Sequence, residues 1–320
     1  MKTKSVATFL AVLAVIAMVL AFGLRRCGAM LGIVTEESAT ATPAGAGAAI
    51  RFEPDYDLAL AADLSLQEEQ VGIPGLKLRL ARPLMFDTYQ VRGLAAVPDY
   101  FYVASVKADM ERAMLYQVRR DTYTVDKERE LEWEGKYRFG GLHLGPDGLM
   151  AVLAGNAQDA TSVVLRMDPQ SLETIGAFEV PDQIRAVAQA GDGNIYGINE
   201  SSEFFYRWAT DGTLLERSAN GFGTSYYDMA VVRGSLVCSG YWRDRGIGVI
   251  DVIDPTSFTL LARHPAYAHS MGGRWVTQLG FDCVNGEFLF LPDDGNLPML
   301  LTYVLADDMT LEEYIPSSGQ

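Results

Sequence analysis

Hydrophobic residues form four short runs between Gln183 and Ala219, and a group of turn-forming residues follows each run. Short apolar runs bounded by Gly, Asn and Asp are typical of β-strands rather than of helices. Two of the boundaries read Gly-Asp-Gly and Thr-Asp-Gly, which favour tight turns because both residue types tolerate the backbone angles that such turns need. This segment is therefore expected to form one antiparallel sheet of four strands.

The same arrangement is repeated along the rest of the chain. An aspartate marks the turn between the third and fourth expected strands of each repeat, at Asp121, Asp168, Asp211, Asp254 and Asp308. Successive markers are 43 to 54 residues apart, and a period of about 40–50 residues with four strands is typical of a β-propeller. Because aspartate accepts local backbone hydrogen bonds in turns, we assign these residues to turns and not to catalysis.

Five such repeats fit between Tyr89 and Ile315. The fold class is therefore expected to be all-β, a β-propeller of four-stranded blades, with five blades as the favoured number. An alternating stretch from Leu76 to Leu80 indicates a further strand. This strand is expected to close the ring against the last blade. The alternative is that it begins a sixth blade.

An uncharged apolar stretch of 19 residues runs from Val6 to Leu24, which is enough for one N-terminal transmembrane helix. Two arginines follow it directly and leave no clean cleavage site, so an uncleaved signal anchor is expected. The expected organisation is a signal-anchor segment at 1–34, a flexible tether at 35–50, an N-terminal extension at 51–88 with a short helix and the closing strand, and the propeller at 89–320.

The anchor predicts a membrane-bound protein whose propeller lies outside the cytoplasm, in the periplasm or the extracellular space. Export is the default for a signal-like N-terminus, and long downstream domains cross the membrane largely regardless of charge. The alternative is a cytoplasmic propeller, because Lys2 and Lys4 on one side of the helix nearly balance Arg25 and Arg26 on the other.

The formal net charge of −15 limits the range of partners. An acidic surface repels nucleic acid and anionic lipid, so no nucleic-acid partner is expected, and contact with the membrane is expected through the N-terminal helix. The three cysteines fit neither a zinc site nor a disulfide framework. Cys238 is expected to be a small buried residue, and a bridge between Cys238 and Cys283 stays open.

Loops before the first strand and after the second strand of each blade open on one face of a propeller, at the mouth of the central channel. Aligning the repeats places polar residues at that rim, and the candidate ligand-binding residues are Arg92, Arg185, Glu200, Tyr227, Asp228, Gln278 and Asp293. Two guanidinium groups in one pocket suit a carboxylate or another anion. The alternative is that Arg185 and Asp228 pair across the channel and only fill it.

A metal-dependent hydrolase is the second functional hypothesis. Asp228 and Asp293 carry oxygen atoms that suit a divalent cation such as calcium, and His269 or Glu200 would be the base. The sequence contains no nucleophile elbow, phosphate-binding loop or zinc-protease motif. No cofactor is therefore expected, apart from calcium under this hypothesis, and no catalytic residue is assigned.

Four stretches of the sequence resemble a known family: LRMDPQSLETI, YGINESSEFFYRWATDG, SYYDMAVVRGSLVCSGY and FLPDDGNLPMLLTYV. Together they are similar to an uncharacterised bacterial β-propeller family of unknown function. More distantly, the blades are similar to the lactonase and strictosidine-synthase-like propellers. In the calcium-dependent lactonases of that group, Glu, Asn and Asp at the channel mouth hold the metal. By this resemblance Asp228 stands at one such place, whereas Arg92, Arg185 and Thr277 stand where further ligands are needed.

The leading hypothesis is a membrane-anchored, extracytoplasmic β-propeller that binds a small ligand or a protein partner through its channel-mouth face. It rests on the apolar anchor, the tether, the acidic composition and the lack of a recognisable catalytic set. The fold alone does not decide between binding and catalysis, because propellers serve many unrelated functions.

Overall fold

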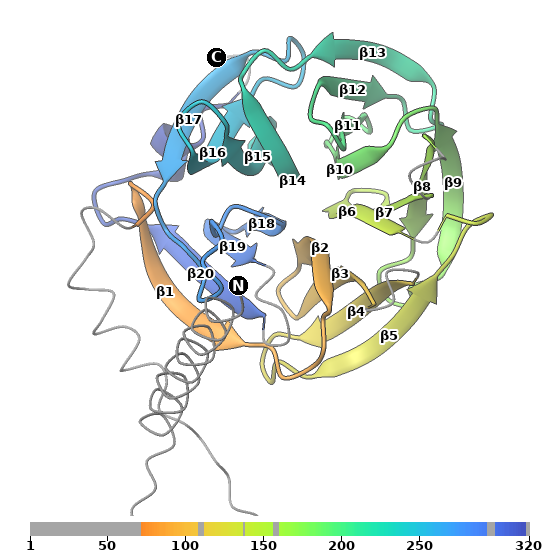
Figure 1. Ribbon diagram of the computed structural model, residues 1–320, viewed down its shortest axis with the longest axis horizontal. Coiled ribbons are helices and arrows are strands. Elements are labelled where there is room, and N and C mark those ends of the chain that lie inside the picture. The colour runs from red at the N-terminus through yellow and green to blue at the C-terminus, as the bar shows by residue number, and fades with distance from the viewer. Residues whose placement is uncertain (1–71, 108–111, 137, 156–159, 293–297, 318–320) are drawn as a thin grey trace, which may run out of the picture. The chain divides into compact units, whose positions relative to one another are not determined.

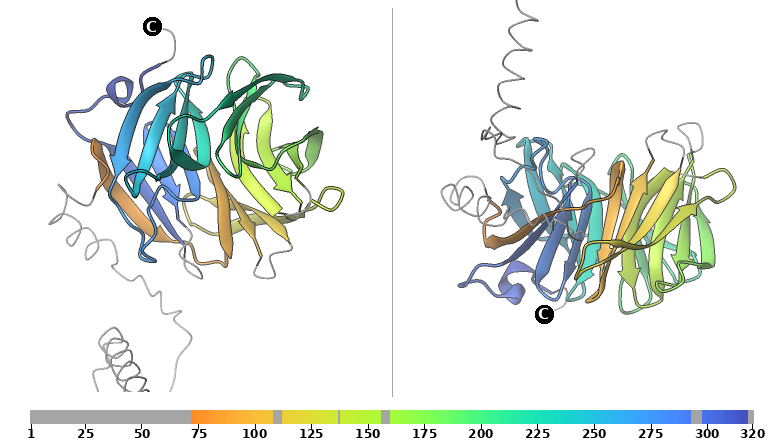
Figure 2. Two further views of the ribbon diagram at one scale, coloured as in Figure 1. Left: turned by 45° about the horizontal axis from the view of Figure 1, so that its top comes forward. Right: turned by 90° about the horizontal axis from the view of Figure 1, so that it is seen from below.

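The computed structural model describes residues 72–317, except for 108–111, 137, 156–159 and 293–297. Its strands form five four-stranded sheets arranged around a central axis (Figures 1 and 2), which confirms the five-bladed, all-β propeller. The predicted signal anchor, the tether and the short helix of the N-terminal extension lie outside the described residues. Among the residues that are described, no helix is long and apolar enough to cross a membrane.

Each blade runs from an inner strand at the axis to an outer strand at the circumference (Figure 1). Blade 1 comprises β2 (Gln90–Ala96), β3 (Tyr100–Val106), β4 (Ala113–Arg119) and β5 (Val125–Leu131). Blade 2 comprises β6 (Arg138–Gly145), β7 (Gly148–Ala154), β8 (Ser162–Met167) and β9 (Thr174–Val180). Blade 3 comprises β10 (Ile184–Gln189), β11 (Ile195–Asn199), β12 (Phe204–Trp208) and β13 (Leu214–Ala219). Blade 4 comprises β14 (Thr224–Val232), β15 (Ser235–Trp242), β16 (Ile247–Ile253) and β17 (Leu260–Ala266).

Blade 5 combines two distant parts of the chain. It comprises β18 (Gly280–Val284), β19 (Glu287–Leu291), β20 (Met299–Leu305) and, as its outer strand, β1 (Leu76–Pro83). β1 pairs antiparallel with β20 along its whole length. The predicted closing strand is thus confirmed, and backbone hydrogen bonds join the two ends of the ring. A short helix, α4 (Leu311–Tyr314), follows β20.

One carboxylate adds ionic contacts to this closure. Glu287 at the start of β19 forms an ion pair with Arg79 of β1 and another, at 2.5 Å, with Arg120 in the turn between β4 and β5. Burial disfavours the charge on Glu287, but the hydrogen bonds from Arg120 and Arg79 outweigh it and lower the pKa of this carboxyl. The first and last parts of the domain are therefore held together by side chains as well as by strand pairing.

The hydrophobic core lies between neighbouring blades. At the boundary of blades 2 and 3, for example, Val152, Val187 and Trp208 are buried in one cluster. Cys238 and Cys283 are both buried and free, so the expected role of Cys238 is confirmed and no bridge joins the two. Burial raises the pKa of the Cys238 thiol well above its usual value, as expected for an inert core cysteine.

The turn role of the repeated aspartates is confirmed where the side chains accept amide hydrogen bonds. Asp168 accepts from two amides of its own turn, at 3.0 and 2.6 Å, and Asp254 does so at 2.6 and 3.0 Å. Asp211 accepts from one amide at 2.9 Å. Asp121 differs, because it pairs with the neighbouring Arg119. These four side chains stabilise local turns.

Four of the five inner strands, as described, carry a β-bulge near their first residues. The extra residue is Arg92 in β2, Arg185 in β10 and Tyr227 in β14, whereas in β6 the irregularity covers Gly140 and Gly141. A bulge redirects the side chain of the extra residue out of the regular alternation. Three of the polar residues that sequence alignment assigns to the rim, Arg92, Arg185 and Tyr227, are therefore the bulged residues of their strands.

Candidate functional site

The inner strands begin at the face of the propeller that we call the mouth face, which also carries the loops after the second strands. Arg185 contacts two residues there. Its Nη1 atom lies 3.3 Å from Oε1 of Glu200, and its guanidinium carbon lies 4.1 Å from the centre of the Tyr227 ring. Nε2 of Gln278 donates to the Tyr227 hydroxyl at 3.2 Å. These four predicted residues form a continuous chain across blades 3, 4 and 5, which we call the mouth group.

Backbone contacts hold the mouth group in one arrangement. Oε1 of Gln278 accepts from the amide of Trp275 at 3.3 Å, which leaves Nε2 to face Tyr227. The Tyr227 oxygen accepts from Gln278, so its own hydrogen can be donated to a ligand. The Arg185 side chain is 16% exposed, and a ligand would therefore meet a partly desolvated cation, whose hydrogen bonds are stronger than in water.

Two predicted residues stand apart from the mouth group. Arg92 belongs to the same face but lies on blade 1, where its Nη2 donates to Gln90 of its own strand at 3.1 Å. Asp293 lies outside the described residues. The structure thus brings together four of the seven residues and leaves the contribution of these two a prediction.

Asp228 lies below the mouth and is fully buried. Its Oδ2 accepts from the amides of Leu94 in blade 1, at 3.2 Å, and Phe281 in blade 5, at 3.0 Å. Its Oδ1 accepts from Met229 at 3.0 Å. Burial raises the pKa of Asp228 well above its usual value, although the three amides act in the opposite direction. Asp228 therefore joins the inner strands of three blades, and it neither pairs with Arg185 nor faces the mouth.

A second buried carboxyl, Asp282 of β18, was not among the sequence candidates. It accepts from the amides of Ala96 in blade 1, at 2.7 Å, and of Cys283, at 2.8 Å. Burial raises its pKa to about 6. A signal for it exists in the sequence, because an acidic residue inside a short apolar strand must find hydrogen-bond partners when that strand is buried.

Asp282 is expected to lower the stability of the fold as the pH rises from about 4 to about 6. The folded carboxyl keeps its proton up to about pH 6, whereas the ordinary value is 3.8. In this window the folded state binds more protons than the unfolded state, so the free energy of unfolding falls with rising pH, by at most about 1.4 kcal/mol per unit. His143 makes the free energy of unfolding rise with pH in this window, because burial lowers its pKa to about 4. The unfolded state therefore binds more protons at this residue than the folded state.

Replacing Asp282 by asparagine should therefore make the slope of stability against pH more positive than in the wild type. Chemical denaturation at several pH values between 4 and 6 measures this slope. Only the difference in slope matters, because the substitution also removes a hydrogen-bond acceptor at every pH. Parallel curves for the two proteins would contradict the assignment.

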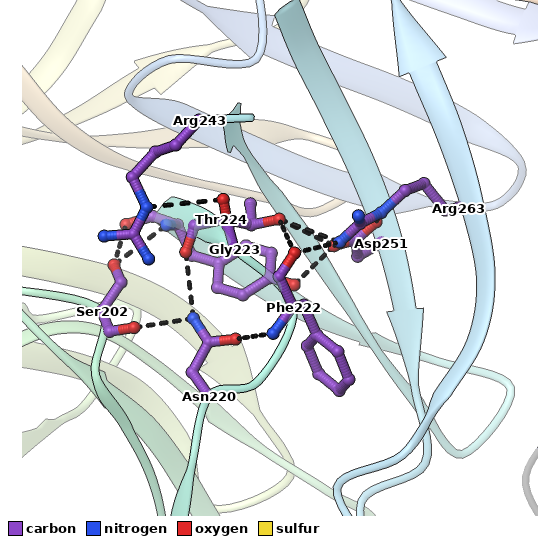
Figure 3. A network of polar contacts seen from close by, with 9 residues as sticks. Ser202, Asn220, Phe222, Gly223, Thr224, Arg243, Asp251 and Arg263 are labelled. Atoms are coloured by element: carbon purple, nitrogen blue, oxygen red, sulfur yellow. Dashed lines mark hydrogen bonds and ion pairs between the residues drawn. The ribbon is translucent and has the colours of Figure 1, made fainter. Parts of the chain in front are cut away.

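A polar network in blade 4 supports the strand that carries Tyr227 (Figure 3). Asp251 of β16 is fully buried and accepts two hydrogen bonds from Arg263 of β17, at 2.8 and 2.7 Å. Tyr226 donates to the same carboxylate at 2.5 Å. Burial disfavours the charge on Arg263, but the hydrogen bond with Asp251 outweighs it and raises the pKa of the guanidinium. These contacts hold Tyr226, the residue next to Tyr227, in place.

A loop segment links blade 4 to blade 3 in the same network. The side-chain nitrogen of Asn220 donates to the carbonyls of Ser202 and Thr224, at 2.6 and 2.9 Å (Figure 3). The Ser202 hydroxyl in turn accepts from the amide of Tyr226 at 3.0 Å. The loop that contains Glu200 and the strand that contains Tyr227 are thus connected, which keeps the parts of the mouth group in register.

Comparison with known proteins finds the fold and no closer relationship. No family model and no curated protein matches the sequence. The solved glutaminyl cyclase of Myxococcus xanthus matches with a TM-score of 0.55 and 10% identity, over 75% of this chain and 100% of that chain. The Pan2 WD40 domain of Neurospora crassa matches with a TM-score of 0.42 and 10% identity, over 68% and 62% of the two chains. The virginiamycin B lyase of Staphylococcus aureus matches with a TM-score of 0.40 and 13% identity, over 68% and 66%.

These likenesses show the fold alone, because all the identities are low and a β-propeller hosts unrelated functions. This chain spans less than two thirds of the Pan2 domain and of the lyase. The protein is a five-bladed β-propeller. Membership of the uncharacterised bacterial family stays a prediction.

Proposed function

We propose that this protein is a membrane-anchored β-propeller outside the cytoplasm that binds a small ligand, or a protein partner, through its mouth face. The observation that carries the proposal is the mouth group itself. Glu200, Arg185, Tyr227 and Gln278 come from three blades and meet in one chain of contacts. Residues separated by up to about 90 positions in sequence thus form one polar surface at the axis.

The chemistry of the mouth group suits binding. A guanidinium stacked on a tyrosine ring is a rigid, partly apolar platform that keeps its edge for hydrogen bonds. Of the three guanidinium nitrogens of Arg185, only Nη1 has a hydrogen-bond or ion-pair partner among the described residues. The other two nitrogens can therefore bind a ligand. Tyr227 adds a hydroxyl donor, and Glu200, which is 42% exposed, adds an acceptor.

A metal-dependent hydrolase has less support. Both oxygens of Asp228 are engaged by amides, and the residue has no exposed surface. The His269 ring packs against Trp275 with ring centres 3.7 Å apart and ring planes tilted by 37°. The described residues contain no group of three or more His, Cys, Asp or Glu side chains that could hold a metal ion. Asp293 lies outside those residues. Melting temperatures measured with calcium and with a chelator would test calcium binding, because a bound ion stabilises the folded state.

The location of the protein is part of the proposal and rests on the sequence. The uncharged stretch from Val6 to Leu24 and the small-residue tether that follows it would hold the propeller at a membrane and leave its mouth face accessible. Protease treatment of intact cells, with a cytoplasmic protein as internal control, would distinguish an external propeller from a cytoplasmic one.

Replacing Arg185 or Tyr227 by alanine is expected to weaken ligand binding at least tenfold, about 1.4 kcal/mol, while the fold is retained. A ligand that binds only the folded state raises the melting temperature with its concentration. A panel of anionic, neutral and cationic small molecules should therefore contain compounds that stabilise the wild type and fail to stabilise both variants.

The matched control is Arg119→Ala, which removes an arginine that is 46% exposed and paired in a turn of blade 1. Its response to the panel should equal that of the wild type. Compounds that stabilise Arg185→Ala and Tyr227→Ala as strongly as the wild type would show that the mouth group is not the binding site.

A further inference from the structure

Arg138 is a cation on the mouth face that sequence alignment passed over, because the aligned rim position of blade 2 is Gly140. It is the first residue of β6 and is half-buried. Within the part of the chain that the structure describes, the side chain of Arg138 forms no hydrogen bond and no ion pair. A half-buried guanidinium with no partner is unusual, because burial removes water that would otherwise solvate five N–H donors.

The direction of the Arg138 side chain follows from its neighbours. Phe139 packs into the cluster between blades 1 and 2. Side chains alternate along a strand, so Arg138 and Gly140 lie on the opposite side, toward blade 3. A Cβ atom on Gly140 would indeed overlap the carbonyl oxygen of Ile184, the first residue of β10. Arg138 therefore stands on the side of β6 where blade 3 begins.

Two glycines bring the ends of these inner strands close together. A Cβ on Gly141 would lie 2.8 Å from the carbonyl oxygen of Arg185, a separation that only glycine permits. The backbones of β6 and β10 thus touch beside the bulge that carries Arg185. Because glycines occupy the bulge of β6, that bulge carries no side chain next to the backbone of Arg185.

The acidic residue nearest in sequence to β10 is already engaged. Asp182 accepts from the amide of Gln183 at 2.8 Å, from Asn199 at 3.1 Å and from the Tyr206 hydroxyl. Three donors thus already occupy the carboxylate of Asp182, within a chain whose formal net charge is −15. Guanidinium groups bind planar carboxylates through paired hydrogen bonds.

We propose that Arg138 and Arg185 form an anion subsite on the mouth face, where β6 and β10 begin, and that the ligand of the mouth group carries a carboxylate that binds there. This inference rests on the proposed function and specifies the class of its ligand. Tyr227 and Glu200 then contact the remainder of the ligand, so a small organic carboxylate fits the site better than a bare inorganic ion.

The test compares matched probes that differ in charge. Benzoate and its neutral counterpart benzamide, with inorganic phosphate as a second anion, are titrated at constant ionic strength against the wild-type propeller. Benzoate should raise the melting temperature in proportion to the logarithm of its concentration, and benzamide should have at least a tenfold weaker effect. Arg138→Ala and Arg185→Ala should each weaken benzoate binding at least tenfold, whereas Arg119→Ala should bind as the wild type does.

Each outcome distinguishes this inference from the proposed function. Without ligand, Arg138→Ala should melt at or above the wild-type temperature, because it loses an unpaired cation; a large drop would indicate a structural role instead. Benzoate binding that survives in Arg138→Ala but fails in Arg185→Ala and Tyr227→Ala would overturn the subsite and leave the proposed function standing. Binding of phosphate without binding of benzoate would contradict the assignment of a carboxylate ligand. Benzoate binding that is unaffected in all three variants would overturn both proposals. No response to either anion would overturn the subsite.

Discussion

Replacing Asp228 by alanine is expected to lower the free energy of unfolding by about 3–5 kcal/mol, because it leaves buried amides of three strands without acceptors. The amides of Leu94 and Phe281 belong to blades 1 and 5, and both point at one oxygen of this carboxyl. Each unsatisfied buried donor costs about 1–3 kcal/mol. Urea denaturation of the isolated propeller would measure the change.

Two controls test the reason for this loss. Asp228→Asn keeps one oxygen, which can still accept from Leu94 and Phe281, but turns an NH₂ group toward the amide of Met229, so an intermediate loss is expected. Asp211→Ala removes one hydrogen bond in an exposed turn and should cost about 1 kcal/mol or less. A loss for Asp228→Ala no larger than that of Asp211→Ala would show that water replaces the carboxyl at no cost.

Replacing Asp251 by alanine is expected to have a similar effect, about 3–5 kcal/mol, for an electrostatic reason. Arg263 would keep its charge with its side chain 16% exposed, and the hydroxyl of the buried Tyr226 would lose its acceptor. Removing one partner of a buried ion pair costs more than replacing both partners, because the charge that remains stays desolvated. The melting temperature should fall by many degrees in a domain of this size.

A double replacement separates the two contributions. Asp251→Leu with Arg263→Met removes both charges and keeps apolar volume, so it should recover a large part of the stability lost in Asp251→Ala. Asp251→Leu alone, Arg263→Met alone and the two together form a double-mutant cycle when their free energies of unfolding are compared with that of the wild type. Equal losses in the single and double variants would mean that the pair contributes by shape and not by charge.

The Asp251 variant also tests how the mouth group is supported. Tyr226 is held by Asp251 from one side and by Ser202 from the other, and Tyr227 follows it at the bulge of β14. If this support matters, the variant should lose benzoate binding at temperatures where it is still folded. The same measurement on Arg119→Ala shows whether the loss is specific to blade 4.

The number and order of the blades could be predicted because their signals are local. Turn aspartates such as Asp168 and Asp254 bind amides two or three residues away, so each turn is encoded by its own few residues. The closing strand at Leu76–Pro83 was also visible, because its alternating pattern indicated a strand with no partner nearby in sequence. The rim positions Arg92, Arg185 and Tyr227 were found for the same reason, since the repeat aligns them, although only the structure shows that they are bulges.

The contacts of the polar residues at the axis could not be predicted from local sequence signals. Asp228 finds amides 134 and 53 residues away, and nothing in its own strand distinguishes a buried bridge from an exposed ligand. Arg138 was missed because its importance depends on Gly140 and Gly141 bringing two strands together. The sequence by itself determined a five-bladed, four-stranded repeat and its closure, through short-range turn chemistry and strand periodicity. Only the tertiary structure decided which charges are buried, paired or open, because those states depend on neighbours supplied by other blades.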